Sequence, residues 1–278
     1  MYSRLPRLLA ALSVGAALSA AGWVYQEIFT NRMASPDILG VSSGSGVGAS
    51  IAIILGYGMS AIGVMAFVFG LASVLLTMTL SKVFSNNSDK TLSMILSGIV
   101  IGGLMSSILG FLKYISNDAQ LATVTYWLLG GFYNVTYTEL LVVLPIIGIG
   151  LFLLLLLRWK IMILKNGEID AKIHGVNYSV MRATSIALAT IVTAASVSIS
   201  GTIGWIGLAI PNFIRILVRD NEKQVLPLAM IYGSAFTGLS DFFARSITGT
   251  EIPIGIITGI FGALIFIITI FVRRYKNG

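Results

Sequence analysis

Long apolar runs and short polar loops alternate along the whole chain. Because the hydrocarbon core of a membrane takes about 20 apolar residues per helix, this pattern predicts an all-α polytopic membrane protein with about nine transmembrane helices. The loops are too short to hold a soluble domain, so residues 1–278 are expected to form one transmembrane domain. The candidate runs, of which 204–218 is the weakest, are 8–28, 38–56, 60–81, 92–112, 138–157, 183–200, 204–218, 225–244 and 254–272.

Two regions contain residues that interrupt a helix. In residues 200–212 the interrupting residues are Gly201, Gly204, Gly207 and Pro211. Broken helices at membrane depth are tolerated where the backbone is buried in protein or lines a watery cavity. We therefore expect this segment to form part of a translocation pathway. A second break is predicted within residues 114–137, where a short amphipathic piece at 121–129 ends in two glycines.

The longest polar loop, residues 158–182, is expected to carry two short helices. Residues 168–174 have charges compatible with a helix, Gly175 suits the position just after its end, and a second short turn can follow at Asn177. Such an exposed face of mixed character is suited to docking a cytosolic protein.

Composition and charge distribution fit a membrane protein better than a nucleic-acid-binding one. The chain is 56% hydrophobic and 10% charged, whereas soluble domains are about 45–50% apolar and about 25% charged. The formal net charge is +7, but the Lys and Arg residues are spread over loops and form no single basic stripe, which argues against nucleic acid as a partner.

The basic residues are also distributed unequally between the two sides of the predicted membrane domain. With alternate loops assigned to opposite sides, one side holds 14 of the 18 Lys and Arg residues. The positive-inside rule makes that side cytoplasmic, so the C-terminus is expected inside and, with nine spans, the N-terminus outside. The 14 residues are Arg32, Lys82, Lys90, Arg158, Lys160, Lys165, Lys172, Arg182, Arg215, Arg219, Lys223, Arg273, Arg274 and Lys276.

Residues 1–24 have a second interpretation as a signal peptide. Arg4 and Arg7 would form its basic region, and the small residues at 17–22 its cleavage site. The apolar stretch runs on through Tyr25, however, which is longer than the apolar region of a signal peptide, and favours a membrane helix.

The sequence carries few of the groups that catalysis would need. It has no GxxxxGK[ST] motif for cradling nucleotide phosphates, no cysteine, and one histidine, His174, in a polar loop. The clear ionisable residue within a span is Asp241, which could serve a gradient-driven carrier or channel. Arg245 lies four residues further on, so an ion pair on one helix face is the other interpretation.

Six stretches in order resemble the FecCD family, the permeases of ABC importers for ferric siderophores, haem and cobalamin. The resemblance covers nearly the whole chain. The stretches are Arg4–Ala11; Asn31 with Ala34–Gly44; Tyr126–Gly131; Gly175–Asn177; Gly201–Leu208 with Pro211 and Arg215; and Glu251–Gly255.

This resemblance implies a transport subunit that catalyses no reaction and binds no cofactor, located in the bacterial cytoplasmic (inner) membrane. The expected cargo is an iron complex. The expected partners are two cytosolic ATPase subunits that bind ATP and Mg²⁺, an extracytoplasmic substrate-binding protein, and a second permease copy in a homodimer or related heterodimer.

The resemblance also assigns roles to residues of this chain. Contacts to the ATPase are expected in the loop 158–182, at Glu168, Lys172, Gly175 and Asn177. Contacts to the binding protein are expected at Arg4, Arg7 and Arg245.

Three features depart from the family pattern of ten helices. The helix that precedes the Arg4–Ala11 stretch is absent, so we expect either a start upstream of Met1 or a subunit that works without that helix. The usual Asn-Pro-Leu is Asn31-Arg32-Met33 here, and the usual Pro-His is Pro211-Asn212, which leaves any role of that histidine open.

Overall fold

The computed structural model describes residues 4–84, 90–219, 221–247 and 250–277. Side chains of four residues in the predicted charge asymmetry, Lys90, Arg273, Arg274 and Lys276, lie outside this description.

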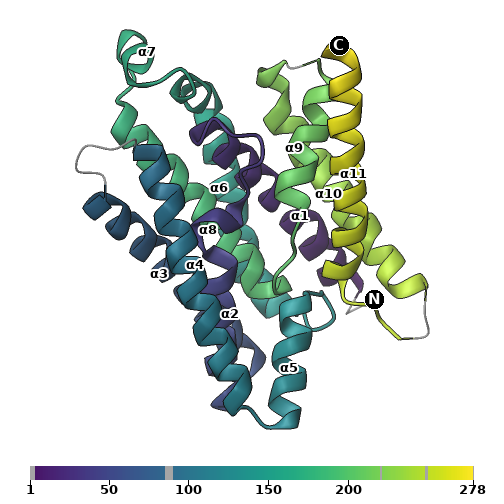
Figure 1. Cartoon of the computed structure of the whole chain (residues 1–278). Coiled ribbons are helices and arrows are strands. Elements are labelled where there is room, and N and C mark those ends of the chain that lie inside the picture. The colour runs from purple at the N-terminus through teal and green to yellow at the C-terminus, as the bar shows by residue number, and fades with distance from the viewer. Residues whose placement is uncertain (1–3, 85–89, 220, 248–249, 278) are drawn as a thin grey trace.

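Helices make up all the regular structure in the described residues (Figure 1). The elements in chain order are α1 Arg4–Ile28, the 3₁₀ helix η1 Pro36–Leu39, α2 Val41–Ile54, α3 Met59–Phe84, α4 Lys90–Ile115, α5 Asp118–Leu129, α6 Tyr137–Leu164, α7 Glu168–Ile173, α8 Tyr178–Ser200, α9 Ile206–Leu217, α10 Glu222–Ser246 and α11 Ile254–Asn277.

All nine predicted apolar runs form helices, which confirms the all-α polytopic fold. Among the described residues, seven helices are long and apolar enough to cross a membrane. The other two, α2 with 14 residues and α9 with 12, would be about 21 Å and 18 Å long at 1.5 Å per residue. A hydrocarbon core of about 30 Å is thicker than either, so α2 and α9 are half-length helices.

The helical structure is interrupted just before α2, at a position that the hydrophobic pattern did not indicate. Gly40 adopts φ 80° between η1 and α2, so the predicted continuous run over 38–56 is wrong at its start. Two hydroxyl groups of α3 donate to carbonyl groups at this break: Ser73 to that of Gly40 at 2.8 Å, and Thr77 to that of Leu39 at 3.1 Å. Such internal partners are what allow irregular backbone at membrane depth.

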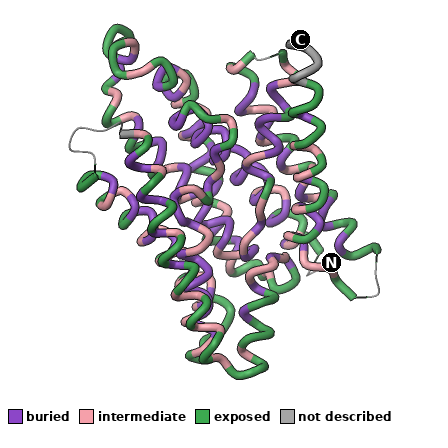
Figure 2. The backbone as a smooth tube through the Cα atoms, viewed as in Figure 1, coloured by how far each residue is buried: buried purple, intermediate pink, exposed green. Residues whose placement is uncertain are grey.

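Helix α1 packs against α6, α8, α9 and α10. Most of its residues are buried, and Figure 2 shows buried residues through the middle of the molecule. The contact of α1 with α10 is antiparallel and very close. A Cβ atom added at Gly15 would lie 2.2 Å from the carbonyl oxygen of Gly233. Small residues permit such an approach, and in lipid this packing holds helices together.

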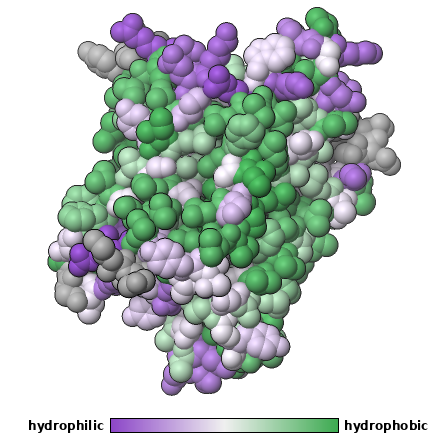
Figure 3. Space-filling model, turned by 180° about the vertical axis from the view of Figure 1, so that it is seen from behind, coloured by the Kyte–Doolittle hydropathy of each residue, from purple (hydrophilic) through white to green (hydrophobic). Residues whose placement is uncertain are grey.

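The two ends of the domain differ in character. Figure 3 shows a hydrophobic surface over the middle of the molecule and hydrophilic side chains gathered at the end that carries α7. We call this end the α7 end and the opposite one the α5 end. The C-terminus lies at the α7 end and the N-terminus towards the α5 end (Figure 1), as an odd number of crossings requires. Which end faces the cytoplasm stays a prediction.

Candidate functional site

Three interrupted segments, distant in sequence, meet in what we call the break junction. It comprises residues 128–131, 200–205 and 253–255. The amide of Gly131 donates to the carbonyl of Ser200 at 2.8 Å, and the amide of Ile254 donates to the carbonyl of Gly130 at 3.0 Å. Three of the six motif stretches therefore contact one another directly, which sequence order alone could not indicate.

Gly201 illustrates why the helix breaks where it does. Its φ of 65° lies in the left-handed region, and a Cβ atom there would come 2.1 Å from the carbonyl oxygen of Trp127. Only glycine fits both constraints. The hydroxyl of Thr202 then donates to the carbonyl of Leu128. The predicted break is confirmed, since α8 ends before Gly201 and α9 begins only at Ile206.

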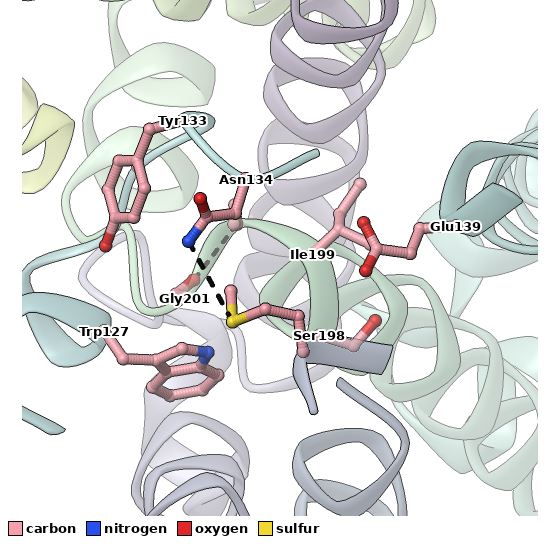
Figure 4. A pocket seen from close by; sticks show the side chains of 10 residues that line it. Trp127, Tyr133, Asn134, Glu139, Ser198, Ile199 and Gly201 are labelled. Carbon is pink, nitrogen blue, oxygen red and sulfur yellow. Dashed lines mark hydrogen bonds between the residues drawn. The ribbon is translucent and has the colours of Figure 1, made fainter. Parts of the chain in front are cut away.

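A small cleft opens beside the junction (Figure 4). The amide of Asn134 lies 3.9 Å from the sulfur of Met59. Burial raises the pKa of the Tyr133 phenol, and the neighbouring Glu251 and Tyr126 raise it further, so this ring presents a neutral hydroxyl group. The cleft is lined by Met59, Trp127, Gly131, Tyr133, Asn134, Glu139, Ser198, Ile199, Ser200 and Gly201.

These groups suit polar contact rather than chemistry. The cleft is lined by a phenol, an amide, two serine hydroxyls and one carboxylate. The carboxylate is that of Glu139, which also accepts from the amide of Thr136 at 3.1 Å to cap α6. Within the described ranges, no group of three His, Cys, Asp or Glu side chains could hold a metal ion.

The four residues predicted to line a pathway have different surroundings. Gly201 is enclosed in the junction, and Pro211 is buried within α9. Gly207 packs against α1, where a Cβ atom at Gly22 would come 1.9 Å from the carbonyl oxygen of Gly207. Gly204 has no atom within 4 Å of an added Cβ and faces open space. Their role in a pathway stays a prediction.

Asp37 is a candidate that the sequence analysis missed. It lies on η1, exposed, and accepts a hydrogen bond from the hydroxyl of Ser42. Its neighbour Ile38 contacts α4 at Gly98, where a Cβ atom would come 2.0 Å from the Ile38 carbonyl oxygen, so Asp37 sits beside the interior turns of a membrane helix. It stands just before the apolar run 38–56, which is why the count of intramembrane charges did not include it.

The cleft around Asp37 joins η1 to the break after α8. Its walls include two residues of the break junction, Ile203, which is buried, and Trp205, which is 42% exposed. The lining residues are Leu18, Ser35, Pro36, Asp37, Ser42, Thr193, Ile203, Trp205, Gly207 and Leu208. Two half-length helices, α2 and α9, thus begin on either side of one small polar cleft.

The loop 158–182 carries one short helix instead of the two predicted. Helix α7 covers Glu168–Ile173, and Gly175 follows it with φ 70°. The expected second turn is in fact the first turn of the long helix α8, because the side chain of Asn177 accepts from the amide of Val180 at 3.1 Å and caps α8.

Helix α7 exposes an apolar pair that the charge pattern concealed. Ile169 and Ile173 are 80% and 75% exposed and lie one turn apart, so they share a helix face. The predicted contact residues Glu168 and Lys172 are also exposed. His174 is held by its own helix, with Nδ1 2.8 Å from the carbonyl oxygen of Asp170.

A cluster of charged side chains joins α1 to α10 and to the segment before α11 near the α5 end. Asp241 is 2% exposed, and its carboxylate lies 2.9 Å from Arg7 and 3.1 Å from Arg245. Arg7 also binds Glu251 at 2.8 Å. The predicted pair of Asp241 with Arg245 is confirmed. Arg4 is exposed, whereas the side chain of Arg7 is only 12% exposed; the docking role of Arg4, Arg7 and Arg245 stays a prediction.

Comparisons with known proteins agree on one family. A model of the FecCD transport family matches residues 1–273. The molybdate import system permease protein MolB of Haemophilus influenzae is 37% identical over 276 residues, which are 99% of this chain and 81% of that protein. The probable iron chelatin transport system permease protein of Helicobacter pylori is 34% identical over 271 residues, 98% of this chain and 82% of that protein.

A solved structure resembles the whole fold. It is described as an inward-facing conformation of an ABC transporter assigned to the metal-chelate type. It shares 37% sequence identity with this chain at a TM-score of 0.89, and the match covers 96% of this chain and 85% of that one.

Proposed function

The chain belongs to the FecCD transport family, and on this premise we propose that it is the permease through which an ABC importer carries an iron complex, a ferric siderophore or haem, across the bacterial cytoplasmic membrane. That it is an ABC transporter transport subunit and a multi-pass inner-membrane protein follows from the family. The observation that carries the proposal is the family match over residues 1–273. The iron cargo, the partners and the pathway residues are proposed.

The geometry around the half-length helices supports a translocation role. In transporters, discontinuous helices near the bilayer midplane commonly form the substrate site. Here α2 and α9 both begin beside the cleft that contains Asp37 and Trp205. We place the pathway along this cleft and Gly204. Asp37→Asn should slow uptake without weakening ATPase binding; unchanged uptake would remove Asp37 from the pathway.

The cargo assignment has two direct competitors. One relative is named for molybdate, another for an iron chelatin and a third for cobalamin, so molybdate and cobalamin stand beside iron complexes as candidates. The three can be separated by transport of ⁵⁵Fe-labelled chelates, labelled molybdate and labelled cobalamin by one preparation. Uptake of molybdate alone would overturn the iron assignment and leave the importer function intact.

The α7 end is the proposed ATPase contact. Its exposed Ile169 and Ile173 can enter an apolar groove of an ATPase, with Glu168 and Lys172 at the rim, while Gly175 and Asn177 set the angle between α7 and α8. With this contact the basic side and the C-terminus would face the cytoplasm, as the positive-inside rule predicts. ATP and Mg²⁺ would bind to the partner, and this chain would bind no cofactor.

The α5 end is then the proposed docking face for the extracytoplasmic binding protein. Exposed Arg4 and partly exposed Arg245 are available there, whereas Arg7 supports the face from within. A second permease copy, identical or related, would complete the pathway.

Energy coupling separates this proposal from a gradient-driven carrier. Asp241, the residue such a carrier would use, is held by two arginines. Purified chain in liposomes should take up no cargo under a proton gradient, and uptake should appear only with ATP, an ATPase and a binding protein. Gradient-driven uptake by the chain alone would overturn the importer proposal.

A further inference from the structure

A guanidinium group is buried between four helical elements at the α7 end. Arg215 of α9 is 1% exposed. Its Nη2 lies 2.7 Å from Glu27 of α1, its Nε lies 3.2 Å from Glu222 of α10, and its Nη1 donates to the side chain of Gln26. Lys165, at the end of α6, reaches Glu222 at 3.7 Å.

Stability alone is a weak explanation for this cluster. Removing charges from water costs several kcal/mol per ion, and well-packed apolar side chains often replace a buried ion pair without loss. Glu27 even keeps one carboxylate oxygen, Oε2, buried without a hydrogen-bond partner. What such a cluster supplies is a fixed geometry, because an arginine fork holds its acceptors in defined directions.

The cluster extends to the broken segment through a carbonyl group that the helix itself cannot satisfy. In α9 the carbonyl of Gly207 would accept from the amide of residue 211, but Pro211 has no amide hydrogen. The Nε2 atom of Gln26 donates to this carbonyl at 3.2 Å. Pro211, predicted from sequence as a pathway residue, thus creates the acceptor to which Gln26 binds.

Both ends of this series of contacts lie in regions already given a role. Lys165 lies three residues before the start of α7 at Glu168, in the loop assigned to the ATPase. Gly207 lies in the first turn of α9 and lines the cleft with Asp37. The contacts in between run from Lys165 to Glu222, Arg215, Gln26 and Gly207.

We propose that Arg215 and Gln26 are positioning residues that couple movement of the ATPase-contacting loop to the start of α9 at the pathway. When the ATPase displaces the end of α6, the shift passes through Glu222 and the Arg215 fork to Gln26, which moves the first turn of α9. The inference rests on the proposed ATP-driven function, and it assigns the coupling to these side chains.

The chain offers a clean way to test this, because it contains no cysteine. Gly204→Cys places a single thiol beside the break, at a position where an added Cβ meets no atom within 4 Å. The rate of thiol modification is measured in the full complex, assembled with a cysteine-free ATPase and the binding protein. Two states are compared, one without nucleotide and one trapped by addition of ATP and vanadate. The protein that carries Gly204→Cys alone is the reference. Its rate of thiol modification should differ between these two states by about fivefold or more, the lower end of typical coupling between sites.

Gln26→Met removes the donor to Gly207 and should abolish this difference. Gln26→Asn is a second variant that keeps an amide but shortens the side chain by one carbon–carbon bond, about 1.5 Å, so it tests the same contact if the Met variant folds poorly. Gln120→Met is the matched control, because Gln120 likewise donates to a distant carbonyl, that of Ile54 at 3.1 Å, at the opposite end.

Three results are decisive. Loss of the nucleotide response in both Gln26 variants with retention in Gln120→Met supports the coupling role. A response that persists in the Gln26 variants, or is lost equally in Gln120→Met, overturns it. If the thiol of the reference protein does not respond to nucleotide although its uptake requires ATP, the coupling role is overturned; if its uptake does not require ATP, the ATP-driven function is overturned instead.

Discussion

Arg7→Met should destabilise the domain, although Arg7 lies near a surface proposed for docking. Arg7 binds Asp241 at 2.9 Å and Glu251 at 2.8 Å. Its removal leaves Asp241, which is 2% exposed, with Arg245 as its remaining ion-pair partner in the described residues. Breaking a fully buried pair costs about 3–5 kcal/mol. Because Arg245 remains and Glu251 is 47% exposed, we expect a smaller loss, about 2 kcal/mol.

This loss can be measured as thermal unfolding in detergent, monitored by tryptophan fluorescence. At about 2–4 °C per kcal/mol for a chain of this size, the midpoint should fall by about 4–8 °C. Arg4→Met is the matched control, since Arg4 is exposed and such substitutions usually change stability by less than about 0.5 kcal/mol. Equal midpoints for the two variants, together with weaker binding-protein affinity for Arg7→Met alone, would refute the structural role and support direct docking.

Three further results are expected. Gly201→Ala should sharply reduce the yield of folded protein in size-exclusion chromatography because its Cβ would meet the Trp127 carbonyl, while Gly204→Ala should not; equal yields would contradict the break geometry. Joint replacement of Ile169 and Ile173 with Ser should weaken ATPase association at least about tenfold in a pull-down titration, given roughly 1.5–3 kcal/mol per buried side chain; unchanged binding would remove α7 from the interface. Lys172→Cys should react with an impermeant maleimide only in inside-out vesicles, and labelling of intact cells would reverse the topology.

The membrane-spanning helices could be predicted because the hydrocarbon core requires about 20 apolar residues in each of them, and such runs are visible in the sequence. The break at Gly201 could be predicted as well, since glycines and a proline interrupt the run after Ser200. By contrast, the break at Gly40 could not: the run continues through it, and the hydroxyls of Ser73 and Thr77 that stabilise it come from another helix.

The parts of the site that could not be predicted are mainly contacts between side chains that lie far apart in the sequence. The i,i+4 spacing of Asp241 and Arg245 was visible in the sequence, but Arg7 lies 234 residues from Asp241. Arg215 was predicted only as a family match and as a basic residue of the cytoplasmic side, because nothing local shows that Gln26, Glu27 and Glu222 surround it. An exposed face of mixed character was predicted for α7, but its apolar pair, Ile169 and Ile173, was not, because the prediction rested on the charged residues around them.

The central claim, an ATP-driven permease, is tested most directly by reconstitution. The chain is placed in liposomes with its ATPase inside and its binding protein outside, and uptake of ⁵⁵Fe-labelled chelates, labelled molybdate and labelled cobalamin is followed with and without internal ATP. We predict uptake of an iron complex that requires ATP and both partners and survives collapse of the proton gradient. Uptake by the chain alone, dependent on that gradient and indifferent to ATP, would contradict the account.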